Sequence, residues 1–547
     1  MLGLIQDRPF LLSDAVAYAA RYHASTAVIS RQRDGTFLRS NWRETDRRVR
    51  RLASALRQRG FGIGDRIATL SWNNHRHLEL YFAISAIGAI CHPINPRLFP
   101  EQAIYIADHA EDTALFFDLE YAQLAQSIAA ACPRISLFVH LEDERTRPDI
   151  GRKTAMGYEE LLQEGDDKFE YPQFDERTAA SLCYTSGTTG NPKGVLSSHR
   201  ALVVHALAAR SADIFALPPQ SVACCIVPLY HAHASWGLPF AAAMSGSALV
   251  LPGLALDGHG LIETFSETAT TVANGVPTIW YNVASGLKDQ PANFKLGRIV
   301  VAGSAPSPDL VGRLEQAGVS VCHLWGMTET GPCGTSGALP AWTSGLPDEQ
   351  VRSLQSKQGH GMFGVEMRIE DENGRALEWG EQNIGRLKVR GPYVISGYFK
   401  GEGKGAVDSE GWFDTGDVAI IDAHGYMKLL DRAKDLLKSG GEWISSIDVE
   451  NAAMSHPAVR EAAVIGIPHD IWGERPLLLV VPNEGYEYDE VSIRTHLADR
   501  IAKWWLPEKV ELVASLPRTG TGKVMKGELR RMYGVARTDS PVRIDAA

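Results

Sequence analysis

Between two ordered elements the chain reads Tyr184-Thr185-Ser186-Gly187-Thr188-Thr189-Gly190-Asn191-Pro192-Lys193-Gly194. The apolar run Ala179 to Cys183 before it predicts a short buried strand, and a helical pattern begins after it at Arg200. Glycine lets the backbone approach a ligand closely, while backbone N–H groups, hydroxyls and a lysine bind anions. The stretch therefore predicts a loop that wraps a polyphosphate, and a flexible surface turn is the alternative.

The length and composition indicate a multidomain globular protein. A chain of 547 residues is too long for a single core, so we expect at least two domains. Its hydrophobic content of 44% and charged content of 22% are ordinary for globular proteins. The net charge of −10 gives no electrostatic support to nucleic-acid binding, and we interpret the arginine-rich run Arg47 to Arg51 as a solvated helix face.

The cysteines and the N-terminal residues bear on the cellular location. The seven cysteines form no CxxC pair and no Cys/His metal spacing, and their odd number fits reduced, mostly buried thiols. Met1 to Phe10 lacks the basic and apolar regions of a signal peptide. No uninterrupted apolar run reaches the roughly 18 residues that a membrane-spanning helix needs. We therefore expect a cytoplasmic protein without a membrane span.

Alternating helical and strand patterns predict helix-covered parallel sheets in the first part of the chain. A helical pattern begins at a cap-like Asn41, and Arg66 to Leu70 follows as a strand. Farther along, the strand Arg298 to Ala302 leads to a helix for which Ser307 is the expected cap. The charged segment Glu142 to Arg177 has little periodicity, so we interpret it as a surface connection. The βα alternation is typical of an α/β fold.

After about Gly359 the pattern changes to short strands and glycine turns, which include Gly397-Tyr398-Phe399. This part predicts a small β-barrel or twisted sheet. From Asp431 onward the pattern suits a compact α+β module, which is long enough to form its own domain. We predict a large N-terminal domain of helix-covered sheets over residues 1–431, with the β-barrel-like part as a subdomain. A small mobile α+β domain would follow over residues 432–547.

Four separated stretches resemble the signature motifs of one family. They are the loop from Tyr184 to Gly194, Trp325 to Glu329, Trp412 to Asp417, and Pro517 to Lys523. In this order and at these separations they resemble the acyl-adenylate-forming superfamily, which contains AMP-forming acyl-CoA synthetases, nonribosomal adenylation domains and beetle luciferases. The resemblance extends over nearly the whole chain. It implies an enzyme, an AMP-forming acid–thiol ligase, that uses ATP, Mg²⁺ and CoA.

The resemblance implies a role for each residue of the nucleotide site. The loop would hold the β- and γ-phosphates of ATP, and Glu329 would help to hold Mg²⁺, which favours carboxylate oxygen; a helix N-terminal carboxylate is the alternative for Glu329. Trp325 stands where relatives carry Tyr and would stack on adenine, with a core aromatic as the alternative. Asp417 would accept hydrogen bonds from the ribose hydroxyls. Arg432 would reach the nucleotide, and Asp431 replaces the usual glycine before it. The implied ATP- and AMP-binding residues are Thr185, Ser186, Gly187, Thr188, Thr189, Gly190, Lys193, Gly303, Ser304, Ala305, Pro306, Trp325, Gly326, Met327, Thr328, Asp417 and Arg432.

Beside Glu329, the implied catalytic side chains are Lys523 and His231. An ammonium group on a glycine-rich turn stabilises charge that develops on the α-phosphorus, so Lys523 would carry the first step. A solvated surface lysine is the alternative. His231 resembles the histidine beside the acyl pocket that gates access for the thiol. A buried histidine hydrogen-bonded to the backbone is the alternative, and it is the favoured interpretation of His233.

The resemblance implies that the small C-terminal domain serves two half-reactions. The substrate carboxylate would attack the α-phosphorus of MgATP and give acyl-AMP and pyrophosphate. The domain would then rotate about Lys434, and the CoA thiol would displace AMP. The implied hinge and CoA-channel residues are Lys434, Ser439, Gly440, Gly441, Glu442 and Trp443.

We expect the substrate to be a short- to medium-chain aliphatic acid. The implied acyl-pocket residues are His231, Trp236, Val276, Gly303 and Met327. They are mainly apolar, and the bulky Trp236 would shorten the pocket. The run Gly275 to Trp280 is similar to medium-chain fatty-acyl-CoA ligases, and Ile94 to Pro100 is similar to methylmercaptopropionate-CoA ligases. The resemblance therefore makes 3-(methylthio)propionate a candidate.

Other interpretations stay open. An acyl-AMP ligase for another acceptor, an aryl-acid–CoA ligase or a non-catalytic adenylate-binding sensor would carry much of the same motif set. The expected partners are a small carboxylic acid, ATP and CoA, and no nucleic acid is expected. The sequence leaves the oligomeric state open, and a homodimer is one of the assemblies it allows.

Overall fold

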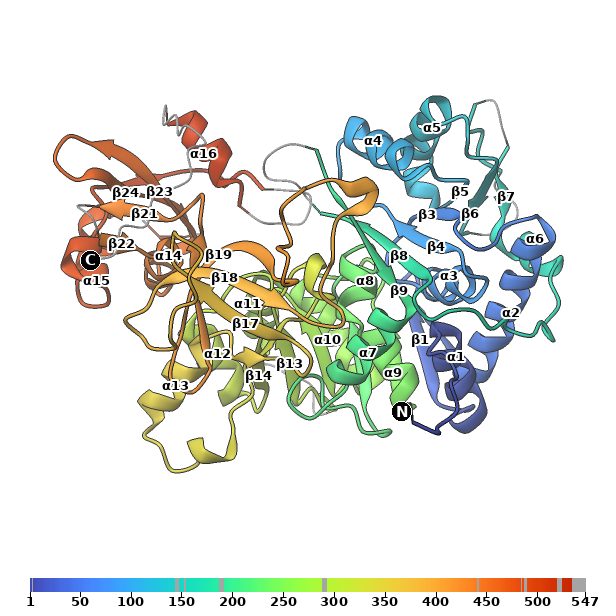
Figure 1. The fold of residues 1–547 in the computed structure, drawn as a ribbon. Coiled ribbons are helices and arrows are strands. Elements are labelled where there is room, and N and C mark those ends of the chain that lie inside the picture. Colours follow the sequence, from blue (N-terminus) through green and yellow to red (C-terminus); the bar gives the residue numbers. More distant parts are fainter. Residues whose placement is uncertain are drawn as a thin grey trace.

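The structure is a computed structural model, and it describes residues 1–547 except 2, 143–146, 152–153, 186–190, 288–292, 440–441, 484, 487–488, 519–523 and 534–547. Within the described residues, two seven-stranded sheets form the first part of the chain, a four-stranded sheet follows, and a five-stranded sheet belongs to the C-terminal part. Figure 1 shows the C-terminal strands and helices, in orange and red, at the end of the molecule opposite α2 (Trp42–Gln58) and α6 (Tyr158–Gln163).

The first seven-stranded sheet carries the predicted phosphate loop at one edge. Its order is β7-β6-β5-β3-β4-β8-β9, and its pairs are parallel except for the antiparallel pair β8–β9. The strands are β3 (Arg66–Leu70), β4 (Ile90–Pro93), β5 (Ala114–Phe117), β6 (Leu137–His140), β7 (Met156–Gly157), β8 (Ala179–Tyr184) and β9 (Gly194–Ser198). The predicted buried strand before the loop is confirmed as β8, and the loop connects it to β9.

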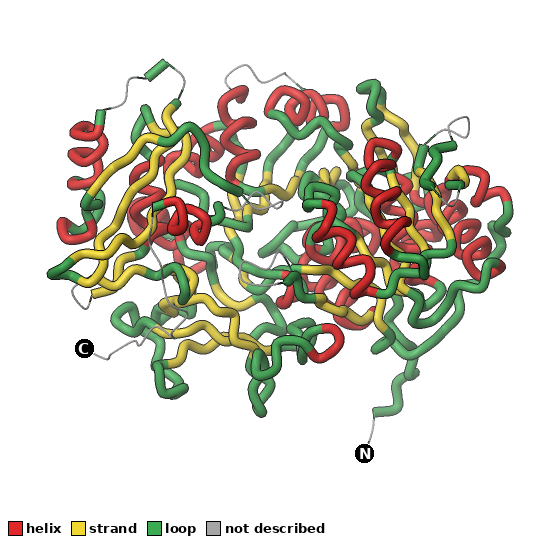
Figure 2. Tube along the Cα trace, turned by 90° about the horizontal axis from the view of Figure 1, so that it is seen from above, coloured by secondary structure: helices red, strands yellow, loops and turns green. Residues whose placement is uncertain are grey.

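The second seven-stranded sheet has the order β14-β13-β12-β10-β11-β1-β2, and its pairs are parallel except for β1–β2. The strands are β1 (Ala27–Arg31), β2 (Phe37–Asn41), β10 (Val222–Cys225), β11 (Ala248–Leu251), β12 (Val272–Gly275), β13 (Arg298–Val301) and β14 (Ser320–His323). Figure 2 shows helices, in red, lying beside the yellow strands. Parallel strands need this cover because both of their faces are apolar.

Helices cover the two sheets, and side-chain caps begin several of them. The other helices of this part are α1 (Leu12–Tyr22), α3 (His75–Ala86), α4 (Pro100–Ala110), α5 (Ala122–Ala131), α7 (His199–Ala209), α8 (Ala232–Trp236), α9 (Leu238–Ser245), α10 (Gly258–Thr268), α11 (Pro277–Gly286), α12 (Pro308–Gln316) and α13 (Asp348–Ser356). The predicted caps are confirmed: Asn41 accepts a hydrogen bond from Glu44 N–H, and Ser307 accepts one from Leu310 N–H. In the part of the chain that the structure describes, every helix falls short of the length and apolarity needed to cross a membrane.

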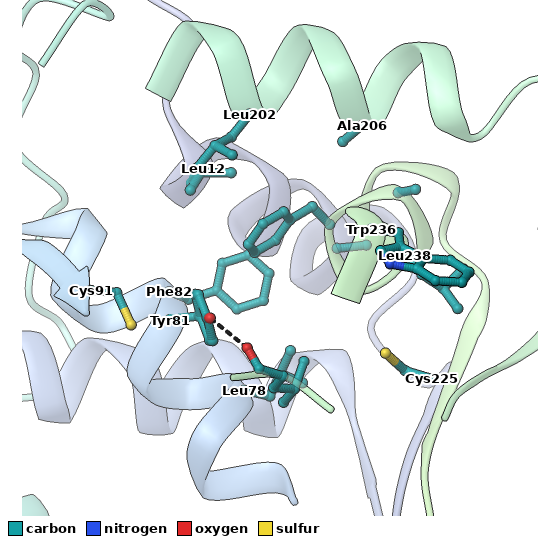
Figure 3. Packing of buried hydrophobic residues seen from close by; sticks show 14 of the residues in the cluster. Leu12, Leu78, Tyr81, Phe82, Cys91, Leu202, Ala206, Cys225, Trp236 and Leu238 are labelled. Carbon is teal, nitrogen blue, oxygen red and sulfur yellow. Dashed lines mark hydrogen bonds between the residues drawn. The ribbon is translucent and has the colours of Figure 1, made fainter. Parts of the chain in front are cut away.

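A large apolar cluster packs the helices between the sheets. Figure 3 shows Tyr81 and Phe82 of α3 near Leu12 of α1 and Leu202 of α7, with Trp236 at the right of the view. The hydroxyl of Tyr81 donates to the carbonyl oxygen of Leu229 at 2.6 Å, so the polar end of this buried ring is satisfied. The cluster thereby joins the segment after β10 to the sheet that carries the phosphate loop.

The small sheet and the C-terminal module follow in chain order. The subdomain was predicted as a small β-barrel or a twisted sheet, and in the structure it is a sheet. Its strand order is β17-β18-β19-β20, and all of its pairs are antiparallel. Its strands, and the short pair before it, are β15 (Thr335–Ser336), β16 (His360–Gly361), β17 (Glu366–Glu370), β18 (Gly385–Arg390), β19 (Phe413–Ile421) and β20 (Met427–Arg432). The predicted C-terminal α+β module contains β21 (Leu437–Ser439), β22 (Glu442–Ile444), β23 (Val459–His469), β24 (Gly473–Pro482), β25 (Lys509–Leu512), α14 (Ser446–Met454), α15 (Glu490–Ala498) and α16 (Lys526–Met532).

Two expectations about surface segments are correct only in part, since Arg47 and much of the described part of segment 142–177 are exposed. The side chain of Arg48 is only 19% exposed, and its guanidinium donates to Glu79 at 2.8 Å and to Glu159 at 2.9 Å. The helical pattern showed which face is charged, but a buried carboxylate on α3 turns part of that face inward. The charged segment 142–177 contains β7 and α6 among its described residues, and Tyr158 of α6 is buried and donates to Glu79.

His199, the first residue of α7, should make the stability depend on pH. Leu12 N–H donates to its Nδ1 at 3.1 Å, and burial lowers the pKa of His199 to about 4. An unfolded histidine takes up a proton near pH 6.5, whereas the folded residue stays neutral. Its contribution to stability is therefore complete above about pH 6.5 and falls as the pH drops toward about 4. In His199→Asn, an acceptor remains near the Nδ1 position but does not titrate. Between about pH 7 and pH 5, we expect the free energy of unfolding of this variant to fall by about 2 kcal/mol less than that of the wild type.

Urea unfolding at the two pH values measures this difference. The same substitution at the exposed His259 is the control. The stability of this variant should depend on pH in the same way as that of the wild type. A wild-type pH dependence in His199→Asn would contradict the assignment.

Candidate active site

The base of the predicted phosphate loop is a closed hairpin. Thr185 N–H donates to the carbonyl oxygen of Lys193 at 2.9 Å, which continues the β8–β9 pairing into the loop. His109 of α4 places Nδ1 at 2.6 Å from the hydroxyl of Tyr184, so α4 holds the end of β8. Both ends of the loop are thus fixed, while Ser186 to Gly190 lie outside the described residues.

A segment that follows β18 covers this base. The Gly397-Tyr398-Phe399 motif leads into the 3₁₀ turn η5 (Phe399–Gly401), in which Lys400 has a φ of 56°. A Cβ atom on Gly194 would lie 3.0 Å from the Cβ of Phe399 and 3.0 Å from Leu182 Cδ1. The glycine that ends the loop therefore lets η5 approach the hairpin closely.

Tyr398 contacts both Glu329 and the loop lysine, Lys193. Glu329 is buried in the 3₁₀ turn η3 (Thr328–Thr330), and Ile395 N–H donates to its carbonyl oxygen at 3.0 Å. The hydroxyl of Tyr398 donates to Glu329 Oε1 at 2.7 Å. Lys193 Nζ lies 5.1 Å from the centre of the Tyr398 ring. Burial and the neighbouring Glu329 raise the pKa of Tyr398, so its hydroxyl remains a donor.

Asp417 is the buried acidic residue at the centre of the predicted nucleotide site. Arg432 Nε donates to its Oδ1 at 2.8 Å, and the Asp417 carboxylate raises the pKa of Arg432. Trp325 Nε1 donates to Asp417 Oδ2 at 2.9 Å. The ring of Trp325 is only 6% exposed and packs in the large apolar cluster, so the core-aromatic alternative describes its surroundings. Its indole N–H still reaches the site, and its stacking on adenine stays a prediction.

The predicted adenine-flanking turn joins β13 to α12. Gly303 has a φ of 90°, which favours glycine, and it is exposed together with Ser304. A Cβ atom on Gly303 would lie 3.2 Å from Val276 Cγ1, so two of the predicted acyl-pocket residues are neighbours. The chain then runs from β14 through Gly326, Met327 and Thr328 into η3, and Met327 N–H donates to the hydroxyl of Thr330 at 3.0 Å.

The two histidines before α9 have different surroundings. His231 is half-buried, its N–H donates to the carbonyl oxygen of Pro228 at 2.9 Å, and its ring lies 4.8 Å from that of Tyr230. His233 is fully buried with Nε2 at 3.0 Å from the hydroxyl of Ser197, and burial lowers its pKa to about 4. His233 is thus a hydrogen-bonded core histidine, and the hydroxyl of Ser197 on β9 is one of its partners.

Trp236 ends α8 in a conformation that costs energy. Its φ is 64° and that of His233 is 41°, and a non-glycine residue in this region costs about 1–3 kcal/mol. The ring of Trp236 is buried among apolar side chains of the large cluster, as Figure 3 shows. Packing therefore holds α8 in place against the strain of its backbone.

The predicted hinge and CoA-channel residues lie where the chain enters the C-terminal sheet. Lys434 is exposed in the turn between β20 and β21. Ser439 is buried at the end of β21 and accepts a hydrogen bond from Arg475 Nη1 at 3.2 Å. Trp443 lies on β22, and the backbone of Glu442 pairs with Ser439. Gly440, Gly441 and Lys523 lie outside the described residues.

Sequence reasoning missed two charged or polar contacts, those of Tyr398 and Lys526. Lys526 of α16 is buried, with Nζ at 2.8 Å from Glu450 and 3.9 Å from Asp431. Burial opposes its charge, but the carboxylates of Asp431 and Glu450 raise the pKa of Lys526. Asp431 also accepts a hydrogen bond from the hydroxyl of Ser446. The aspartate in place of the usual glycine at 431 was the signal for this contact between β20 and the C-terminal module.

Known proteins resemble the chain over almost its whole length. The family model described as AMP-binding enzyme matches residues 16–399, and that of the AMP-binding enzyme C-terminal domain matches residues 448–523. A 3-methylmercaptopropionyl-CoA ligase of Ruegeria lacuscaerulensis is 44% identical over 98% of this chain and 100% of its own length. A medium-chain-fatty-acid–CoA ligase of Ectopseudomonas oleovorans is 41% identical over 98% of each chain. The crystal structure of ATP-bound MatB from Rhodopseudomonas palustris is 26% identical, with a TM-score of 0.78 over 95% of this chain and 99% of that chain. The domain boundary between residues 431 and 432 lies between the two matched ranges and stays a prediction.

The hydrogen bond from Trp325 to Asp417 should contribute to nucleotide binding. Trp325→Phe keeps an aromatic ring in the core but removes the N–H that orients the carboxylate. We expect ATP binding to weaken about tenfold, since a hydrogen bond to a charged group contributes about 1.5–3 kcal/mol. Titration calorimetry with ATP measures the change. The control is Trp280→Phe, because the Nε1 of Trp280 is buried without a hydrogen-bond partner among the described residues. Equal ATP affinity in the wild type and Trp325→Phe would contradict this role.

Proposed function

Since the chain belongs to the AMP-binding enzyme family and is an AMP-forming acid–thiol ligase, we propose that it joins a short- to medium-chain aliphatic acid to CoA through an acyl-AMP intermediate. The family membership confirms the predicted superfamily, the fold class and the use of ATP, Mg²⁺ and CoA. The choice of acid and the roles of single residues are the proposal.

Residues from separate sheets converge on one nucleotide site, and this convergence carries the proposal. Tyr398 joins Lys193 at the phosphate loop to Glu329, and Trp325 joins the same region to Asp417. The site thus offers a lysine for phosphate, a carboxylate for a metal ion and a second carboxylate for ribose hydroxyls. These are the contacts that an adenylating enzyme needs.

Glu329 is the residue that would hold Mg²⁺. Magnesium bound with a nucleotide needs only one or two protein carboxylates, and the buried carboxylate of Glu329 fits that requirement. When bound, Mg²⁺ supplies positive charge to the phosphates. Lys193 and the loop would hold the departing pyrophosphate.

The reaction would proceed in two steps at one site. An oxygen of the substrate carboxylate bonds to the α-phosphorus as the bond to pyrophosphate breaks, and Lys523 stabilises the charge on the phosphoryl oxygens. The CoA sulfur then bonds to the acyl carbon, AMP leaves, and the thiol proton is released. His231 gates access for the thiol, and rotation about Lys434 exchanges the faces of the C-terminal domain.

Lys523→Ala separates the two steps. We expect acyl-AMP formation, measured as pyrophosphate release without CoA, to fall about 100-fold or more, because an oriented cation is lost from the charged transition state. Thioester formation from supplied acyl-AMP should stay within a few-fold of the wild type. Lys509→Ala, at an exposed lysine of the same domain, is the control for both assays. Equal loss of both steps would contradict the role of Lys523.

The apolar surroundings of the acyl pocket support an aliphatic acid. Trp236 and Val276 are apolar, and Met327 packs against the same large cluster as Trp236. The relatives named for 3-methylmercaptopropionate and for medium-chain fatty acids are similar to this chain over 98% of its length. We therefore propose 3-(methylthio)propionate and other aliphatic acids of short to medium length as the substrates.

Trp236 should set the chain length. A panel of C2 to C12, methylthio and aryl acids, scored by AMP release with CoA, identifies the preferred substrate. In Trp236→Ala we expect the preference to move to longer acids, and Trp236→Phe should move it less, because the ring fills the end of the pocket. The exposed Trp379 provides the control Trp379→Ala. An unchanged preference in folded Trp236→Ala would contradict this pocket, and a preference of the wild type for aryl acids would contradict the proposed substrate class.

We also place the enzyme in the cytoplasm, where its seven buried free cysteines would stay reduced. The proposal includes a homodimer as the hypothesis for the oligomeric state. Sedimentation equilibrium of the purified chain distinguishes a mass of one chain from that of two.

A further inference from the structure

Tyr398 lies between two groups to which the proposed function gives separate tasks. Its hydroxyl donates to Glu329 Oε1 at 2.7 Å, and its ring lies 5.1 Å from Lys193 Nζ. Glu329 is the proposed metal-binding carboxylate, and Lys193 is the lysine of the phosphate loop. One side chain therefore contacts both the proposed metal-binding carboxylate and the loop lysine.

We propose that Tyr398 is a positioning residue that sets the geometry of the metal-binding carboxylate relative to the loop lysine. This inference rests on the proposed function, because it needs Glu329 to hold Mg²⁺. Tyr398 touches the carboxylate rather than the reacting atoms, so it acts through Glu329. A hydrogen bond to one carboxylate oxygen fixes the orientation of the group without removing its negative charge.

The segment that carries Tyr398 is held firmly enough for this task. The rings of Phe399 and His109 pack edge-on with their centres 5.9 Å apart. Lys400 Nζ lies 2.8 Å from a carboxylate oxygen of Glu111. Both contacts are with α4 or its end, which also holds the base of the phosphate loop. Movement of Tyr398 relative to the loop would break these contacts.

Close packing also fixes the ring itself. A Cβ atom on Gly403 would lie 2.7 Å from Tyr398 Cδ2 and 3.3 Å from Lys193 Nζ, so the backbone at 403 lies directly against both side chains. The ring of Phe413 on β19 is also packed edge-on against Tyr398, with the two ring centres 6.4 Å apart. Because its neighbours restrict the ring, the hydroxyl presents a donor at a defined place.

Tyr398→Phe tests the inference, because it keeps the ring against Lys193 and removes only the hydroxyl. Titration calorimetry gives the affinity for ATP with Mg²⁺ and with EDTA, and the ratio of the two is the gain from the metal. We expect this gain to fall about tenfold in Tyr398→Phe, while the affinity for ATP in EDTA stays within about twofold of the wild type. A role in structure alone would lower both affinities together.

The chain contains a closely matched control. The hydroxyl of Tyr171 donates to Asp46 at 2.7 Å, and the Arg50 guanidinium lies 4.3 Å from its ring centre. Tyr171→Phe therefore breaks the same kind of tyrosine–carboxylate bond beside a cation, but away from the nucleotide site. It should leave the metal-dependent gain as in the wild type.

A second comparison shows whether Tyr398 acts through Glu329. Glu329→Gln should remove most of the gain from Mg²⁺, and Tyr398→Phe added to it should cause no further loss. Independent losses in the double variant, or an unchanged gain in Tyr398→Phe alone, would overturn the positioning role while the proposed function stands. A wild-type protein whose ATP affinity does not respond to Mg²⁺ would overturn this part of the proposed function and the inference with it.

Discussion

The buried carboxylate of Asp417 is the constraint on which the site depends. A charge removed from water must be paired, and losing one partner of a buried pair costs several kcal/mol. Asp417 meets this requirement with Arg432, which follows it on the neighbouring strand, and with Trp325, which comes from the segment after β14. The small sheet and the large N-terminal part are therefore held in one arrangement.

Buried charged groups are also paired near the phosphate loop and at the contact between β20 and the C-terminal module. The buried carboxylate of Glu329 is satisfied by Tyr398, whose segment also packs against the hairpin at Gly194. At the end of β20, Asp431 and Glu450 surround the buried Lys526. A rotation of the C-terminal module that separates these ion pairs would have to form others, because buried unpaired charges destabilise the protein. The charged residues at both places therefore depend on contacts between separate parts of the fold.

Local rules predicted what local forces decide. The strand before the phosphate loop and the caps Asn41 and Ser307 were predicted correctly, because a hydrophobic run or a capping side chain acts within a few residues. The interpretation of Arg48 failed because helical periodicity identifies a polar face but not the element that packs on it. For Trp325, the sequence offered a stacking ring or a core ring, and the structure has a core ring whose N–H reaches the site.

By itself, the sequence determined the kind of chemistry. The hydroxyl- and glycine-rich loop, the acidic residues and the lysine-containing turn specify a set of phosphate, metal and ribose contacts by their residue types, and the order of these motifs identifies the family. Only the tertiary structure decided which of these groups touch. Tyr398 lies 69 residues from Glu329 in the chain, and Trp325 lies 92 residues from Asp417. Such contacts depend on how sheets and connections pack, because local periodicity carries no information about a partner so far away along the chain.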